Sequence, residues 1–148
     1  MKRMKYCVGG EWKDSKTDKW MEVTDSSTGE VIAEVPCCTA EEVDEAIAAA
    51  HAAFPAWSAM SISKRTQMMF KWRNVLVEHL DELTVLCSKE LGKNLAEARG
   101  DVLKAIEPTE FACSVPFASQ GNASLQVTTG FDTATYRVPL GVVAGIVP

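Results

Sequence analysis

The chain has 148 residues, a formal net charge of −5 at pH 7 and a sequence pI of about 5.1. This length suits one modest domain and is short for most two-domain enzymes. The acidic balance gives no basic face for nucleic acid or an anionic membrane, and no run of about 20 apolar residues could span a bilayer. The basic start "MKRMK" is followed by no apolar region, so no secretory signal is predicted and a cytoplasmic location is expected.

Short strands are predicted over residues 6 to 37, in the segments "YCVGGEW", "KWMEVTD" and "VIAEVPC". Their alternating apolar and polar residues, with the turn at Thr28 and Gly29 in "SSTGE", indicate a hairpin. A small antiparallel sheet is therefore expected at the start of the chain.

The first helix is predicted to begin at Thr39, which forms the T-x-x-E capping box with Glu42. Further carboxylates in the first turn suit the helix dipole and are interpreted as a solvated cap rather than a metal or acid/base site. Pro55 is expected to close this helix or begin its exit. One apolar face is formed by Val43, Ile47, Ala50 and Phe54.

The longest helix is predicted over residues 63 to 91, and a second helix is expected to follow the break at Gly92 and Lys93. The break lacks the pattern of a phosphate-binding P-loop, because Cys87 and Asn94 stand where that loop needs Gly and Ser or Thr. Gly92 is interpreted as a left-handed helix terminator, with Lys93 near the exposed carbonyls. The core-facing stripe of the longest helix comprises Met69, Trp72, Leu76, Leu80, Leu83 and Leu86.

The next helix is predicted to be capped by Asn94, three residues before Glu97, and to be kinked or restarted at Pro108. Its apolar face comprises Ala98, Val102 and Ile106.

The five cysteines contain no C-x-x-C pair, and the two histidines are far apart, so neither a zinc site nor a disulfide framework is expected. Cys87, on the apolar side of a predicted helix, and Cys113, near the end of another, are interpreted as small buried hydrophobes rather than nucleophiles.

After Pro116 the chain is nearly uncharged and rich in Val, Thr and Gly, which predicts strands. Alternation at Leu125 and Val127, then at Tyr136 and Val138, indicates a two-stranded ribbon around "TTGFD". The final run "GVVAGIVP" is typical of a parallel strand buried on both faces. Such a strand needs neighbours and covering helices, so the fold is expected to be incomplete.

Four segments together resemble the N-terminal part of the aldehyde dehydrogenase superfamily: "YCVGGEWKDS", "EVDEAIAAAHAAFPAWS", "ELGKNLAEARGDV" and "YRVPLGVVAGIVP". The segments "EFACSVP" and "TATYRVPLGVVAGIVP" are most similar to the CoA-acylating methylmalonate-semialdehyde dehydrogenases. The resemblance implies an α/β fold with a small antiparallel sheet, three main helices, oligomerisation strands and the first strand of a nucleotide-binding sheet. It divides the chain into a scaffold (1–121), an oligomerisation ribbon (122–139) and the start of an NAD-binding domain (140–148).

The activity implied by this resemblance is NAD-dependent oxidation of malonate or methylmalonate semialdehyde to an acyl-CoA, with CoA as co-substrate. In that family a cysteine thiolate attacks the aldehyde, hydride passes to NAD, and the thioester is released to CoA after loss of carbon dioxide. The resemblance places the nucleophile, the base and the oxyanion donors beyond Pro148, so no catalytic residue is assigned in this chain. The isolated chain is therefore expected to be inactive and to bind no cofactor tightly.

Three residues receive roles through the resemblance. Ile146 and Pro148 match positions that touch the dinucleotide, although ordinary strand packing explains them equally well. Lys104 matches an arginine that meets the substrate carboxylate, although a solvent-exposed helix lysine is the simpler interpretation; lysine keeps the charge but loses the bidentate fork.

Residues 124–148 are expected to join copies of the chain into a homo-oligomer, because the family uses the matching ribbon as an arm. A different interpretation of the same residues is a free-standing structural or oligomerisation module without enzymatic activity. Downstream DNA encoding "FNFP" or "WNFP" would favour the enzyme, and a genuine stop codon would favour the module.

Overall fold

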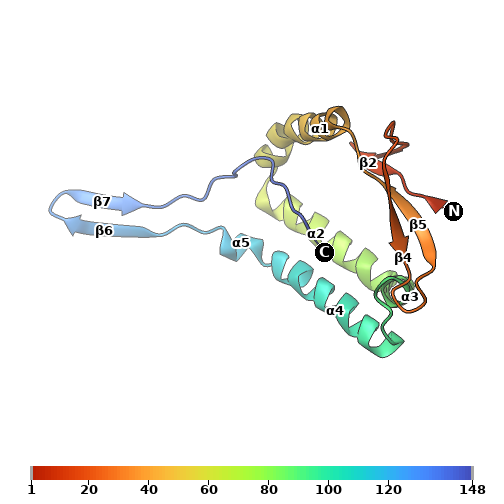
Figure 1. Cartoon of the computed structure of the whole chain (residues 1–148). Coiled ribbons are helices and arrows are strands. Elements are labelled where there is room, and N and C mark those ends of the chain that lie inside the picture. Colours follow the sequence, from red (N-terminus) through yellow and green to blue (C-terminus); the bar gives the residue numbers. More distant parts are fainter. Residues whose placement is uncertain (1, 148) are drawn as a thin grey trace.

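The computed structural model describes residues 2–147 as two small N-terminal sheets and five helices, from which a two-stranded ribbon projects (Figure 1). The helices are α1 (Ala40–Ala59), α2 (Ile62–Glu78), α3 (Leu80–Leu91), α4 (Leu95–Ala112) and the short α5 (Val115–Ala118). The strands are β1 (Lys2–Arg3), β2 (Tyr6–Val8), β3 (Glu11–Lys13), β4 (Trp20–Thr24), β5 (Val31–Pro36), β6 (Ala123–Thr128) and β7 (Phe131–Ala134). The predicted α/β class is confirmed.

The first sheet has the order β1-β5-β4. The hairpin between β4 and β5 is antiparallel, as predicted from the Thr28 and Gly29 turn. The predicted small antiparallel sheet is thus present, and β1 adds to it by pairing with β5 in parallel. The side chain of Arg3 helps to hold the short β1 in place. Its guanidinium lies 4.6 Å from the centre of the Trp20 ring, and its Nε donates to Glu34 Oε2 at 3.0 Å.

The second sheet is the hairpin β2–β3, which lies within the segment predicted as a single strand. Gly9 and Gly10 have φ values of 61° and 84°, and two consecutive residues with positive φ form the type I′ turn that suits a tight hairpin. The Gly-Gly pair was the signal for this turn in the sequence.

Neither proline ends its helix. α1 continues past Pro55 to Ala59, so the helix does not close at this proline and ends four residues later. α4 continues past Pro108 to Ala112, so of the predicted kink or restart the restart is wrong. A proline removes one backbone donor, and each lies close to the C-terminal end of its helix, where few further hydrogen bonds depend on it.

The predicted helix 63–91 is divided at His79, whose φ of −96° and ψ of 13° depart from α-helical values. The His79 amide still donates to Val75, and its carbonyl accepts from Leu83, so both helix ends are satisfied. The division changes the direction of the chain (Figure 1). Because of this turn, α2 and α3 can both pack against α4.

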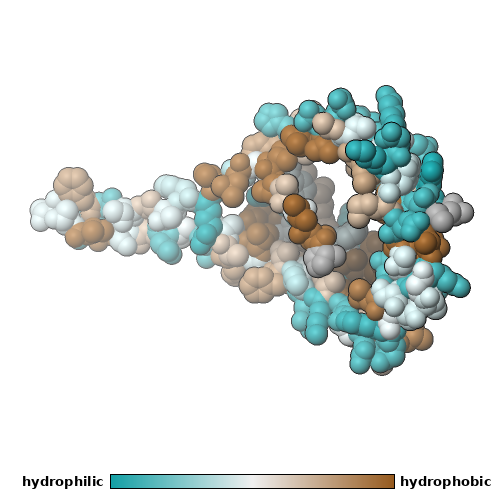
Figure 2. Space-filling model, viewed as in Figure 1, coloured by the Kyte–Doolittle hydropathy of each residue, from teal (hydrophilic) through white to brown (hydrophobic). Residues whose placement is uncertain are grey.

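Few apolar side chains are buried in the described residues: Val8, Leu80, Ala98 and Ile106. The predicted apolar face of α4 is confirmed for Ala98 and Ile106, whereas Trp72 and Leu86 of the predicted α2–α3 stripe are about half exposed. Figure 2 shows an opening on this face of the molecule with hydrophobic side chains along its rim. The helices therefore form a framework whose apolar surfaces are only partly covered.

The chain after α4 forms α5 and then the predicted ribbon of β6 and β7, which meet at the turn before Phe131. The second strand of the ribbon was predicted around Tyr136 and Val138, but both residues lie beyond β7, so the predicted position of this strand is wrong. The structure shows no strand over residues 140–147, contrary to prediction. A strand is defined by its hydrogen-bonded neighbour, and no other described segment pairs with this one.

Candidate functional site

The junction between α3 and α4 is the best-defined site among the motifs singled out in the sequence. Gly92 has a φ of 67°, and its amide donates to the Ser88 carbonyl at 2.9 Å, so the predicted left-handed terminator is confirmed. Ser26, in the turn between β4 and β5, donates its hydroxyl to the Glu90 carbonyl at 2.6 Å. A Cβ atom at Gly92 would lie 2.9 Å from the Ser27 amide nitrogen. Gly92 is thus required both by its conformation and by the approach of the hairpin turn.

Lys93 and Asn94 follow Gly92 and lead into the first turn of α4. Asn94 Oδ1 accepts from the Glu97 amide at 3.0 Å, which confirms the predicted cap. The Lys93 ammonium donates to Asp101 Oδ2 at 2.5 Å. This bond raises the pKa of Lys93 and lowers the pKa of Asp101, so both side chains are charged at neutral pH. Lys93 therefore does not reach a reaction centre within the described residues; it anchors the first turns of α4.

Lys104, the residue matched to the substrate carboxylate, lies on α4 with an exposed side chain. It follows Asp101 by three residues, which places the two side chains on the same face of the helix. Its positive charge contributes to the lowered pKa of Asp101. Lys104 is therefore close enough to Asp101 for their charges to interact, although the structure gives no ion pair between them.

The two residues matched to the dinucleotide lie at the C-terminal end. Ile146 has a fully exposed side chain, and Pro148 lies outside the described residues. Upstream in the same segment, Val142 and Val143 line two hollows together with the apolar face of α1, one of which also includes β2 residues. The apolar side chains of α1 in these hollows are Val43, Ala46, Ile47, Ala50, Ala53, Phe54 and Trp57, and Glu42 also lines one of them. Lys104 lines neither hollow.

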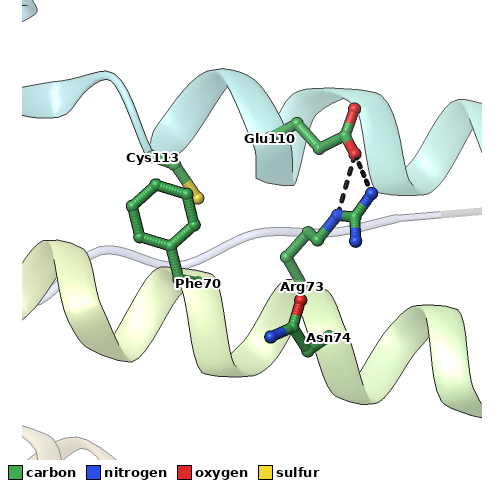
Figure 3. A pocket seen from close by; sticks show the side chains of 5 residues that line it. All are labelled: Phe70, Arg73, Asn74, Glu110 and Cys113. Atoms are coloured by element: carbon green, nitrogen blue, oxygen red, sulfur yellow. Dashed lines mark hydrogen bonds and ion pairs between the residues drawn. The ribbon is translucent and has the colours of Figure 1, made fainter.

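A hollow of about 330 Å³ lies between α2 and α4 (Figure 3). Arg73 Nε and Nη2 both donate to Glu110 Oε1, at 2.8 and 2.6 Å, and cross-link the two helices. Phe70 and Asn74 project from α2, and Cys113 lies at the end of α4. The Cys113 thiol donates to the Thr109 carbonyl at 3.4 Å, and none of the five lining residues is a histidine. The arrangement links α2 to α4 through Arg73 and Glu110, and the interpretation of Cys113 as a small hydrophobe rather than a nucleophile stays a prediction.

The start of α1 differs from the predicted solvated cap, because Glu42 is only 6% exposed. The capping box is present, with Thr39 Oγ1 accepting from the Glu42 amide at 3.3 Å and the Thr39 amide donating to Glu42 Oε2 at 2.9 Å. The same carboxylate also accepts from the Lys16 amide and the Ser15 hydroxyl, both at 2.7 Å. These bonds, the Lys16 amide first, lower the pKa of Glu42. Glu42 is therefore a buried clamp on the loop after β3, which the local sequence pattern could not indicate.

Residues 2–147 include no candidate metal cluster and no candidate membrane span. No cluster of three or more His, Cys, Asp or Glu side chains in this range could hold a metal ion. No helix in the same range combines the length and apolar character needed to cross a bilayer.

The α/β scaffold, with its capped junction and its C-terminal apolar segment beside α1, matches one enzyme family. The model of the aldehyde dehydrogenase family matches residues 12–148, and the chain belongs to this family. The match covers most of the described structure, including the ribbon and the C-terminal segment.

Curated relatives narrow the comparison. The chain is 43% identical over 148 residues to malonate-semialdehyde dehydrogenase 2 of Oceanobacillus iheyensis. This alignment covers 100% of this chain and 30% of the relative. It is 40% identical over 148 residues to the malonate-semialdehyde dehydrogenase of Listeria monocytogenes serotype 4a, with the same coverage. It is 41% identical over 145 residues to the human mitochondrial methylmalonate-semialdehyde/malonate-semialdehyde dehydrogenase [acylating], covering 98% of this chain and 27% of the relative. The chain thus spans about 30% of the length of the bacterial relatives.

Solved structures agree with this comparison. The methylmalonate-semialdehyde dehydrogenase of Oceanimonas doudoroffii superposes with a TM-score of 0.86 at 29% identity, over 95% of this chain and 28% of that chain. A Sinorhizobium meliloti protein provisionally described as a methylmalonate-semialdehyde dehydrogenase, in complex with NAD, gives a TM-score of 0.88 at 25% identity, over 95% of this chain and 29% of that chain. The fold predicted from the resemblance is confirmed.

Proposed function

We propose that the chain is the N-terminal portion of an NAD-dependent semialdehyde dehydrogenase that converts malonate or methylmalonate semialdehyde to an acyl-CoA. The observation that carries this proposal is similarity along the whole chain: 43% identity over 148 residues to a malonate-semialdehyde dehydrogenase. The TM-score of 0.86 against a methylmalonate-semialdehyde dehydrogenase supports the same assignment. We assign the use of CoA on the weaker ground that the human relative is named as acylating.

Within this proposal the chain supplies binding groups and the framework, and the reacting groups belong to the remainder of the enzyme. The Lys104 ammonium, exposed on α4, would meet the carboxylate of the semialdehyde. NAD supplies the hydride acceptor. The exposed apolar side chain of Ile146 suits a contact with the dinucleotide, and Pro148 is assigned the same role from the resemblance alone.

We further propose that residues 1–121 form the framework, 122–139 the oligomerisation ribbon and 140–148 the start of the nucleotide-binding domain. Homo-oligomer formation through residues 124–148 would use the exposed ribbon of β6 and β7. No nucleic acid or membrane partner is proposed, and a cytoplasmic location is assigned from the sequence alone. Cell fractionation of the organism that carries the gene tests the location.

The experiment that tests the function uses a hybrid enzyme, in which residues 1–148 replace the matching part of the Oceanobacillus iheyensis malonate-semialdehyde dehydrogenase. We expect the hybrid to form NADH from NAD, CoA and malonate semialdehyde, with a lower KM for this substrate than for propanal, which lacks the carboxylate. The relative without its own matching part is the control and should be inactive. A folded hybrid that oxidises neither malonate nor methylmalonate semialdehyde would contradict the proposal.

The isolated chain provides the complementary test. We expect no NADH above a buffer control from NAD, CoA and malonate or methylmalonate semialdehyde, because positioning alone cannot replace a nucleophile. Reproducible turnover by the isolated chain would instead require a reacting group among Lys93, Cys87 and Cys113.

A further inference from the structure

The Asp101 carboxylate on α4 lies between two lysines in the sequence: Lys93, just before the helix, and Lys104, one turn further along it. Lys93 Nζ lies 2.5 Å from Asp101 Oδ2, with relative side-chain exposures of 41% and 33%. Lys104 follows Asp101 by one helical turn and is also exposed. The carboxylate therefore has two possible partners, of which the structure pairs it with Lys93.

Asp101 would otherwise be well placed to neutralise Lys104. Acid and base three or four residues apart on a helix are neighbours, and the acid on the N-terminal side is the better order. Within residues 2–147 the structure records no ion pair for Lys104 itself. Asp101 experiences the positive charge of Lys104, but its ion pair is with Lys93, and it is the one carboxylate on α4 that stands in the favourable order before Lys104.

Other carboxylates on α4 are less able to compete. Glu107 follows Lys104 by three residues, which is the less favourable order of charges. Glu97 precedes Lys104 by two turns, and its charge acts on Lys93.

Given the proposed role of Lys104 in binding the substrate carboxylate, we propose that Lys93 is a positioning residue for substrate recognition. By holding Asp101, Lys93 prevents this carboxylate from pairing with Lys104 or repelling the carboxylate of the semialdehyde. Lys93 acts through Asp101 and touches no substrate.

The hybrid enzyme tests this role through KM. Lys93→Ala should raise KM for malonate semialdehyde about three- to tenfold. This is the effect expected when the Asp101 carboxylate, released from Lys93, lies several ångströms from the substrate at the protein surface. The value of kcat should stay within about twofold, since no group that reacts is changed. KM for propanal, which carries no charge, should not change. Lys93→Arg should restore the KM of the parent hybrid, because arginine also holds a carboxylate.

Two controls separate charge from helix stability. The double variant Lys93→Ala with Asp101→Asn should return KM to the parent value, because the competing charge is gone. Arg99→Ala breaks a different ion pair of α4, from Arg99 Nη1 to Oδ1 of Asp81 on α3 at 2.5 Å, and should leave KM unchanged. Asp101→Asn alone removes the competing charge and should therefore leave KM for malonate semialdehyde unchanged or lower it. This variant tests the proposal even if Lys93→Ala fails to fold.

The possible results distinguish this inference from the proposed function. If Lys104→Ala leaves KM for malonate semialdehyde unchanged, the proposed role of Lys104 is wrong. If Lys104→Ala raises KM while Lys93→Ala has no effect, the role of Lys93 is overturned and that of Lys104 stands. A raised KM in Asp101→Asn, or no recovery in the double variant, would also overturn the role of Lys93.

Discussion

Gly92 shows how one residue can meet a conformational and a steric requirement together. Its φ of 67° is left-handed, and the space beside its Cα is filled by the backbone of Ser27. The same turn is bonded to the end of α3 through Ser26. A substitution at Gly92 therefore affects a helix end and the docking of a hairpin at once.

Gly92→Ala is expected to destabilise the chain by at least about 1 to 2 kcal/mol, the cost of a left-handed alanine, with a further contribution from the contact with Ser27. Gly100→Ala is the matched control. Gly100 lies within α4, and a Cβ there has open space, so helix propensity predicts a gain of up to about 1 kcal/mol. Urea unfolding of both variants measures the difference; equal effects would contradict the role assigned to Gly92.

Glu42 should make stability depend on pH. Its hydrogen bonds hold its pKa below the ordinary value of 4.5, so the folded state favours the carboxylate more than the unfolded state does. The resulting stabilisation is fully present above pH 4.5 and is lost as the pH falls through the lowered pKa of the folded state. Glu42→Gln should therefore lower Tm at pH 7 and flatten its decline on acidification.

Thermal unfolding between neutral and acidic pH tests this prediction. Glu11→Gln, which removes an exposed charge on β3, is the control and should leave the decline in place. A Glu42→Gln variant with the pH profile of the unmodified chain would show that the buried clamp is not ionised in the folded state.

At the scale of elements, α4 is the helix against which α2 and α3 are arranged. Arg73 and Glu110 link α2 to α4 with side-chain exposures of 36% and 47%, and such exposed pairs contribute little. Ile106, by contrast, is only 4% exposed. Apolar burial should therefore matter more than the ion pair for the position of α4.

Ile106→Ala is expected to cost about 2 to 5 kcal/mol, whereas the coupling between Arg73 and Glu110 should be below about 1 kcal/mol. A double-mutant cycle of Arg73→Ala and Glu110→Ala in urea unfolding measures the coupling. A coupling larger than the cost of Ile106→Ala would reverse this order.

Local signals in the sequence predicted these helix caps well, because each cap depends on a few neighbouring residues. Thr39, Gly92 and Asn94 all have their predicted roles. Contacts distant in sequence were missed, since no local pattern pairs Arg73 with Glu110, 37 residues away, or buries Glu42 under residues 15 and 16. The division of the long helix at His79 was missed for the same reason. Apolar residues recur at helical spacing on both sides of His79, and only the packing of α2 and α3 against α4, which is distant in sequence, requires the chain to change direction there. The roles of Lys104, Ile146 and Pro148 stay predictions.

At the scale of the whole molecule, the ribbon of β6 and β7 projects away from the helices, and the chain after it returns toward them (Figure 1). Every residue of β6 and β7 is exposed, including Leu125, Val127 and Phe131. A two-stranded ribbon with free edges and apolar side chains readily pairs with another chain.

The full chain is accordingly expected to form a dimer or higher oligomer through residues 124–148. Burial of about 500 Å² of apolar area would contribute roughly 12 kcal/mol before association costs of several kcal/mol or more. Light scattering during size-exclusion chromatography should give a mass above the 16.1 kDa of one chain, and a lower degree of association for a chain ending at Gly121. A uniform 16.1 kDa monomer for the full chain would contradict this expectation.

The bond from Ser26 to the Glu90 carbonyl also sets an order of events during synthesis. The two residues are 64 positions apart, so at about 5 to 20 residues per second Glu90 is made roughly 3 to 13 s after Ser26, when the hairpin is already complete. The hairpin is local and can form early, whereas its attachment requires α3 to be complete and Gly92 to have turned the chain. The N-terminal sheet is thus among the first parts to be translated and among the later ones to reach its final place.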